Sequence, residues 1–334
     1  IPQGPLFTSV VLKLSALMDR EKVYTLTIKN LTDCNGNQIG QYNHAKAGLP
    51  QTLSSSDMII NEILFNPRPN AYDYIECYNR SNKIADLHQL YIANRTVTGS
   101  LGTFKQITDT AYYLFPGDYI VLTEDPVSLS KEYLVKDPST VIKRSALPSC
   151  PDDKGNVVLM TADKTVIDEV QYSEKWHFPL LSNKEGVALE RVDPAAPSQS
   201  ASNWHSAAST AGYGTPGYLN SQYKQPVEPN TTITINPKIF SPDNDGHDDL
   251  ATITYQLEER GYIASITIFD ASGRLMRYLV KNDLLGLKGS WTWDGLDEQG
   301  RKLPSGTYII FTQLFDLKGN KKQYKNTVTL VYGL

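Results

Sequence analysis

Short runs of apolar and β-branched residues recur along almost the whole chain, and several of them alternate with polar residues. Clear examples lie at residues 25–28, 119–122, 157–160 and 265–269. Turn-forming residues separate these runs at short intervals, and helical periodicity is nearly absent. Because successive side chains of a strand point to opposite faces, this pattern predicts an all-β fold of sandwiches or barrels.

One turn motif recurs, Asp-x-x-Gly followed by Asn or Arg. The aspartate of such a turn accepts backbone N–H bonds and the glycine adopts positive φ, so each copy predicts a tight hairpin. The copies begin at Asp33, Asp152, Asp270, Asp297 and Asp316. We interpret them as structural turns that favour antiparallel sheets, and not as a functional repeat.

Two polar stretches, at residues 51–57 and 221–231, have the composition of linkers. They divide the chain into segments 1–50, 58–220 and 232–334. We expect the two larger segments to be independent β-sandwich domains, because each is long enough to bury a core of its own.

The first segment is too short to bury a core alone. Strands are predicted at 8–14 and 23–29, with a third near Ile39. Residues 24–37 resemble the closing hairpin of a bacterial immunoglobulin-like domain, which implies a partial domain whose other strands lie upstream. The alternative is that this hairpin packs onto the next domain. Since the chain starts without an initiator methionine or a signal peptide, we interpret it as part of a longer exported precursor.

Composition narrows the possible partners. The 334 residues carry a formal net charge of −4, and the 32 Lys and Arg are scattered. Nucleic-acid binding is therefore not expected, because it needs a basic patch. No apolar run reaches the roughly 18 residues of a membrane-spanning helix, so no transmembrane segment is predicted. The three cysteines lack metal-ligand spacing, and Cys77 is expected to be a buried apolar residue.

Seven motifs occur in order through residues 58–220. They lie at 59–67, 73–79, 85–87, 115–122, 186–191, 203–204 and 214–220. With these motifs in this order, the segment resembles the lamin-tail domain in the form found in secreted bacterial proteins, although Cys77 stands where the family usually has a larger aliphatic residue. The resemblance implies a compact immunoglobulin-like sandwich joined to other extracellular modules. It implies neither a nuclear location nor chromatin binding.

Four further motifs cover most of residues 232–334. They lie at 240–246, 268–274, 293–295 and 303–308. The segment resembles the immunoglobulin-like domain of the flagellar hook-capping protein, and related modules that end many secreted and gliding-motility proteins of Gram-negative bacteria. Some of those modules are export and surface-attachment signals. The resemblance therefore implies that the chain is extracellular or lies on the bacterial cell surface.

An acidic loop at residues 243–249 is the best chemical candidate in the chain. Oxygen-rich loops with a glycine at a sharp bend bind Ca²⁺, and Asp243, Asp245 and Asp249 would supply the oxygens of a structural calcium site. The loop is not an EF-hand, because Thr252 stands where the bidentate glutamate would be. The alternative is a plain turn, in which backbone N–H groups and neighbouring Lys or Arg satisfy the same oxygens.

Other candidate residues have simpler interpretations. Glu62 and Glu76 lie on adjacent predicted strands, and paired carboxylates serve acid–base catalysis, but we favour strand-face residues paired with Lys or Arg. Trp204 is expected to anchor a core or its rim, with a sugar-stacking platform as the alternative. His205 follows it and could face a partner, although an isolated histidine is more often packed or solvated.

The sequence contains no nucleophile elbow, zinc-binding helix, phosphate loop or dinucleotide fingerprint. We therefore expect no catalytic residues and no enzymatic activity. The favoured function is a structural or adhesive extracellular module, acting as a monomer. The alternative is a glycan- or protein-binding accessory region of a larger secreted enzyme. In either case the expected partner is an extracellular protein or glycan, bound through exposed aromatic residues.

Overall fold

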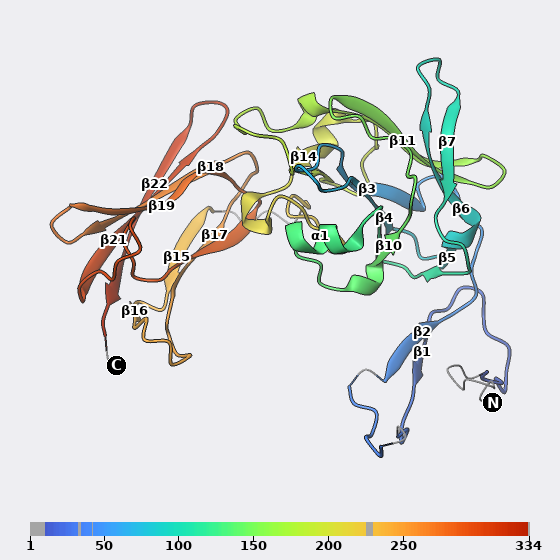
Figure 1. The fold of residues 1–334 in the computed structure, drawn as a ribbon, viewed down its shortest axis with the longest axis horizontal. Helices are drawn as coiled ribbons and strands as arrows, with labels where there is room; N and C mark the ends of the chain where they lie inside the picture. The colour runs from blue at the N-terminus through green and yellow to red at the C-terminus, as the bar shows by residue number, and fades with distance from the viewer. Residues whose placement is uncertain (1–10, 33–34, 42, 225–229, 333–334) are drawn as a thin grey trace.

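Two β-sandwiches and a short N-terminal pair of strands make up the protein (Figure 1). The structure is a computed structural model, and it describes residues 11–32, 35–41, 43–224 and 230–332. In this part of the chain, helix is confined to one short α-helix and five 3₁₀ turns. The predicted all-β class, with tandem sandwiches, is confirmed.

Ten strands build the first sandwich. They are β3 (Met58–Leu64), β4 (Tyr74–Asn79), β6 (Leu90–Arg95), β7 (Leu101–Gln106), β9 (Tyr119–Thr123), β10 (Val141–Lys143), β11 (Lys154–Thr161), β12 (Val166–Ser173), β13 (Leu189–Arg191) and β14 (Trp204–Ser206). One sheet has the order β10-β9-β4-β3-β13-β14 and the other the order β12-β11-β6-β7. Their apolar inner faces form one core, in which Cys77 is fully buried as expected.

Short elements connect these strands. They are β5 (Ala85–Asp86), β8 (Tyr113–Leu114), α1 (Pro126–Glu132), η1 (Leu87–Gln89), η2 (Pro138–Thr140), η3 (Glu174–Trp176), η4 (Ala201–Asn203) and η5 (Ser209–Ala211). The α-helix begins where the sequence favours it, because the carboxylate of Asp125 accepts a bond from the Val127 N–H and Pro126 occupies the first turn.

Eight strands build the second sandwich. They are β15 (Thr232–Asn236), β16 (Ile239–Phe240), β17 (Ala251–Gln256), β18 (Ile263–Asp270), β19 (Leu275–Leu284), β20 (Lys288–Trp293), β21 (Gly306–Phe315) and β22 (Lys321–Leu330). The sheets have the orders β15-β17-β20 and β16-β22-β21-β18-β19. The core between them contains the residues that the alternation placed inward, among them Ile266, Ile268, Trp293 and Ile310.

Three of the predicted Asp-x-x-Gly turns form. At Asp270, Asp297 and Asp316 the carboxylate accepts backbone N–H bonds from its own turn, and the turn glycine has a φ between 74° and 84°. The prediction for Asp152 was wrong, because β11 already begins at Lys154 and runs through the presumed turn. The copy at Asp33 lies outside the described residues.

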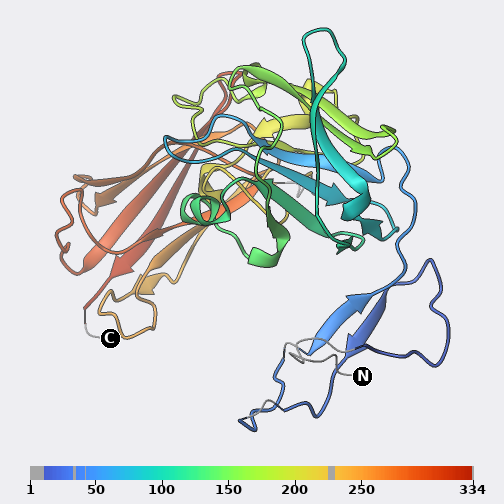
Figure 2. The same cartoon turned by 45° about the vertical axis from the view of Figure 1, so that its right-hand side comes forward.

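The N-terminal segment differs from its prediction. The strand expected at 23–29 is present as β1 (Tyr24–Thr27), and it pairs with an unforeseen strand, β2 (His44–Ala47). Residues 11–14 are not a strand, and residues 8–10 lie outside the described part. The pair projects away from both sandwiches (Figures 1 and 2). At its base, the Lys46 ammonium lies 2.7 Å from an Asp118 carboxylate oxygen of the first sandwich.

The two sandwiches have separate cores, and they also contact each other. Phe178 of the first packs with Ile263 and Leu284 of the second in a small apolar cluster. The hydroxyls of Thr210 and Tyr255 lie 2.9 Å apart across the junction. Burial of apolar side chains and hydrogen bonding therefore both hold the domains together.

Gln222 completes this junction, although the sequence places it in a linker. Its side chain is fully buried and its amide nitrogen donates to the carbonyl of Leu285 over 3.3 Å. The backbone carbonyl of Gln222 accepts a bond of 2.9 Å from the Arg260 guanidinium. The start of the predicted 221–231 linker is thus a packed part of the interface. None of the described helices is long and apolar enough to cross a membrane.

Candidate functional site

Three aspartates of the acidic loop converge in the second sandwich. One carboxylate oxygen each from Asp243, Asp245 and Asp249 lie within 4.8 Å of one another. Asp249 reaches back across the loop, and its second oxygen accepts a bond of 2.9 Å from the Gly246 N–H. Gly246 has a φ of 91°, a conformation that glycine adopts without strain. The structure therefore brings together the three residues that the sequence singles out.

Backbone N–H groups and one hydroxyl donate to these carboxylates. Asp245 accepts a bond of 2.8 Å from the His247 N–H, and Asp243 accepts one of 2.9 Å from the Ser241 hydroxyl. The donors to the three aspartates in the described residues include no Lys or Arg. This part of the turn interpretation, which invoked basic neighbours, was wrong. Whether the site holds calcium stays a prediction.

A second group of carboxylates is buried inside the first sandwich. Glu62 on β3 lies opposite Glu76 on β4 in the strand register and opposite Glu190 on β13. All three have zero exposure to solvent. The predicted adjacency of Glu62 and Glu76 is therefore confirmed. Their expected pairing with Lys or Arg was wrong, because neutral groups donate to both.

The donors come largely from the segment that follows the last strand of this sandwich. Glu62 accepts bonds from the Tyr74 hydroxyl over 2.6 Å and from the Thr215 N–H over 2.9 Å. Glu76 accepts a bond of 2.6 Å from the Gly217 N–H. The segment 214–222 thus crosses the sheet directly over the carboxylates and excludes water from them.

One hydroxyl links two of these carboxyl groups. The Thr215 Oγ1 lies 2.9 Å from an oxygen of Glu62 and 2.8 Å from an oxygen of Glu190. Because a hydroxyl has a single hydrogen, it donates to only one of them. A second full hydrogen bond at the threonine oxygen would therefore need a proton on the other carboxyl group. The geometry thus favours a proton held between Glu62 and Glu190.

The electrostatics agree with a bound proton. Burial raises the pKa of Glu62 to about 8, and the charge of Glu190 adds to that rise against the opposing hydrogen bonds. Burial likewise raises the pKa of Glu76 and of Glu190 above the ordinary value. In this environment, desolvation outweighs the donors that would favour the charged form.

Each of the two sandwiches matches the model of a known protein family. Residues 51–174 match the family model of the Lamin Tail Domain, and residues 233–330 match that of the CHU_C Type IX secretion signal domain. The chain carries a lamin tail domain followed by a type IX secretion signal domain. The second match makes it an exported protein of the cell surface or extracellular space. It also confirms the resemblance seen in the motifs.

No curated protein sequence matches the chain. Among solved structures, it is similar to FlgD from P. aeruginosa, with 18% identity and a TM-score of 0.23, over 30% of this chain and 73% of FlgD. It is also similar to PorZ, a surface component of the type-IX secretion system of Porphyromonas gingivalis, with 10% identity and a TM-score of 0.24, over 80% of this chain and 30% of PorZ. Likenesses of this size carry no argument about function.

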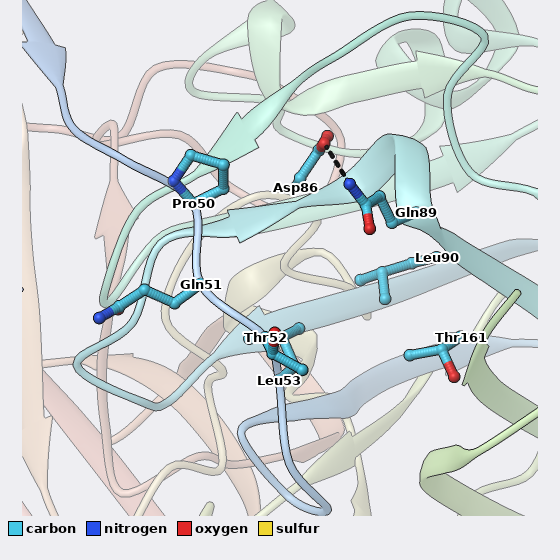
Figure 3. A pocket seen from close by; sticks show the side chains of 8 residues that line it. All are labelled: Pro50, Gln51, Thr52, Leu53, Asp86, Gln89, Leu90 and Thr161. Carbon is cyan, nitrogen blue, oxygen red and sulfur yellow. Dashed lines mark hydrogen bonds between the residues drawn. The ribbon is translucent and has the colours of Figure 1, made fainter. Parts of the chain in front are cut away.

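The lamin tail domain also contacts the stretch that the sequence marks as the first linker. Leu53 packs against its core, and residues 50–53 lie along it to form a cavity of about 160 Å³ (Figure 3). Asp86 and Gln89, joined by a hydrogen bond of 3.3 Å, form part of the opposite wall. Asp86 is the single ionisable residue lining this cavity within the described chain, so it offers no catalytic pair.

The other predicted residues of the lamin tail domain are packed. Trp204 is 3% exposed and its indole N–H donates to the Ser198 carbonyl over 2.8 Å, which confirms the core-anchor interpretation. His205 is half-buried, with a ring nitrogen 3.0 Å from the Ser206 carbonyl. The sequence reasoning missed Glu190 and Thr215, although both lie inside motifs that it used. The available signal was Glu190, a charged residue that directly follows the apolar run 187–189.

Proposed function

We propose that the chain is a non-catalytic structural or adhesive module of the bacterial surface, in which the secretion signal domain directs export and the lamin tail domain is displayed. The packed junction between the two domains carries this proposal. Gln222 contacts both domains and is itself buried, so a packed junction, and not only the chain, joins the secretion signal domain to the lamin tail domain.

The burial of the paired carboxylates supports a non-catalytic role. A general acid or base must come within about 3 Å of its substrate, directly or through one water. Glu62 and Glu76 have zero exposure and lie under the segment 214–222. Turnover by the purified chain on a panel of glycoside, ester and phosphodiester substrates, lost in Glu62→Gln or Glu76→Gln, would contradict this part of the proposal.

We further propose that the acidic loop holds a structural Ca²⁺. Three carboxylates whose oxygens lie within 4.8 Å of one another repel, and neither Lys nor Arg donates to them among the described residues. A hard divalent cation with oxygen ligands would relieve that repulsion. The backbone N–H donors already shape the loop, so the ion would strengthen the turn and not create it.

Surface display can be tested in a bacterium that has a type IX secretion system. Cells expressing the whole chain should label with an antibody added from outside, and an isogenic strain lacking the system should not. Deleting residues 233–330 should retain the chain inside the cell. Adhesion to a glycan- or protein-coated surface should fall in the unlabelled strains. External labelling that survives either change would overturn the proposal.

A further inference from the structure

Two neighbouring cavities on the lamin tail domain share one wall, the indole of Trp176. One has a volume of about 620 Å³ and is bordered by the β6–β7 hairpin, the start of β11 and the end of β12. The other has a volume of about 470 Å³ and lies at the junction with the secretion signal domain, where Arg260 and Gly261 contribute. Both cavities therefore border Trp176 at the surface of the lamin tail domain. Neither contains the carboxylate clusters described above.

Trp176 stands on a rigid support. Its ring stacks on Trp204, with centroids 6.3 Å apart and planes 28° from parallel. The Arg191 guanidinium also packs on Trp204, with its carbon 5.0 Å from the ring centroid. Arg191 is itself held by the Ile60 carbonyl and by Asp168. An aromatic ring ordered in this way binds without a further loss of side-chain entropy.

The charge of the two cavities is opposite to that of the chain. Within the described residues, four basic side chains line them and no Asp or Glu does, although the chain has a net charge of −4. These basic residues are Arg95, Lys154, Lys175 and Arg260. Arg95 is already paired with Glu169 over 2.7 Å, which leaves three cations for a ligand. An anionic ligand is therefore favoured.

Several polar atoms around the cavities have no hydrogen-bond partner in the described structure. They are the Asn156 carbonyl oxygen, the His177 Nε2 and one Arg260 guanidinium nitrogen, all buried. Buried polar groups ordinarily find partners, and these three atoms belong to residues that line the cavities, so the lining is polar and incompletely satisfied. Burial lowers the pKa of Arg260.

A peptide strand is disfavoured as the occupant. β12 is an edge strand and borders the larger cavity, so an extended peptide could in principle pair with it. Gln199 already occupies that edge. Its side-chain oxygen accepts from the Gln171 N–H over 3.3 Å, and its nitrogen donates to the Glu169 carbonyl over 2.9 Å. Sugar hydroxyls, in contrast, need no strand edge and stack their apolar face on an indole.

We propose that the surface around Trp176 binds an acidic oligosaccharide, with one sugar ring against Trp176 and carboxylate groups toward Lys154, Lys175 and Arg260. This inference rests on the proposed surface role and names its partner class. The amides of Asn94 and Gln171, which line the larger cavity, meet the hydroxyls. The smaller cavity, with Arg260, takes a carboxylate.

The test titrates the whole purified chain with short oligogalacturonates, oligomannuronates and sialylated oligosaccharides, by calorimetry and tryptophan fluorescence. At least one acidic sugar should bind, weaken as salt rises, and bind about tenfold more tightly than its methyl ester. Lys154→Gln should weaken binding several-fold, and the matched exposed control Lys131→Gln should not. Trp176→Ala should abolish binding. If that variant does not fold, Trp176→Phe, which keeps an aromatic ring, should retain part of the affinity.

Two results would overturn the inference. One is that no member of the panel binds better than its methyl ester. The other is that a glutamate-rich peptide binds and competes at Lys154 while the sugars do not. Antibody labelling of the same variants on cells separates this outcome from a failure of the surface role. Normal labelling without sugar binding rejects the ligand class alone, whereas absent labelling of the wild type rejects the proposed function.

Discussion

Two clusters of three carboxyl groups lie in the described part of the chain. In each, neighbouring carboxylates would repel one another, and the two clusters differ in how that repulsion is reduced. In the lamin tail domain, Glu62, Glu76 and Glu190 are completely buried. In the secretion signal domain, Asp243 and Asp245 are exposed and sit on a loop with backbone N–H donors. Water screens the second cluster, whereas the first has to be neutralised from within the protein.

The difference shows that the number of acidic residues does not by itself define a site. Burial raises the pKa of Glu62 and of Glu190, and the Thr215 hydroxyl bridges the two carboxyl groups. The second cluster lies at the surface, where a cation can reach it. Each cluster therefore predicts a different response to mutation, pH and metal.

The largest expected effect comes from removing the bridging hydroxyl in the buried cluster. Thr215→Val leaves Glu62 and Glu190 each short of a partner inside the sandwich, and should lower the free energy of unfolding by roughly 3 kcal/mol. Urea unfolding followed by tryptophan fluorescence measures it. Thr103→Val, an exposed position on β7, is the matched control and should change stability by less than about 0.5 kcal/mol. Equal effects at the two sites would show that the bridge is unimportant.

The second prediction concerns pH. Glu62 is protonated to a higher pH in the folded state, where its pKa is about 8, than in the unfolded state, where it is ordinary. Between these values the folded state binds more protons, so stability falls as pH rises from about pH 5 to about pH 8.

Glu62→Gln mimics the protonated form, so it should flatten this dependence while keeping most of the stability at low pH. The exposed Glu21→Gln should leave the dependence intact. A melting temperature of wild type that rises over the same pH interval would mean that the buried cluster is ionised.

The third and smaller effect belongs to the exposed loop. Millimolar Ca²⁺ should stabilise the chain by about 1 to 2 kcal/mol, the value for an extracellular site with a dissociation constant near 10⁻⁴ to 10⁻³ M. The melting temperature should rise with calcium and fall with chelator, and Asp245→Ala should abolish the difference. Asp163→Ala, which removes an exposed turn aspartate elsewhere, should not. Indifference of the wild type to calcium would leave the loop as a turn.

The smallest effect is expected at the N-terminal strand pair. Its ion pair to the first sandwich joins Lys46 and Asp118, whose side chains are 47% and 37% exposed, so water screens it. A chain beginning at Gln51 should therefore melt within a degree or two of the whole chain, by calorimetry. A large loss of stability would mean that the strand pair is an integral part of the lamin tail domain.

Much of the fold could be predicted because strand alternation and turn chemistry are local. Ile266, Ile268 and Trp293 are buried where the two-residue period places them. The turn at Asp152 failed for a tertiary reason, since β11 extends through it and pairs with β12. The partner of β1 was missed because β2 contains His44 and Lys46, which give no apolar pattern.

The candidate sites divide in the same way. Asp243, Asp245 and Asp249 lie within seven residues, so their convergence could be foreseen from the loop alone. Glu190 and Thr215 meet Glu62 across more than a hundred residues, and pairing at that distance depends on strand register and on the path of the segment 214–222. Trp176 was missed because its importance comes from cavities between elements that are distant in sequence.

Gln222 has a mechanical consequence. Its backbone N–H is bonded to Glu190 and its side chain to the Ser206 carbonyl in one domain, while Leu285 and Arg260 bond to it from the other. A pulling force applied between the two domains is therefore shared by hydrogen bonds at a buried clasp before it reaches the covalent connection. Rupture of this clasp would remove the Gln222 N–H from Glu190, so tension between the domains would weaken the hydrogen bonding of the buried carboxyl cluster.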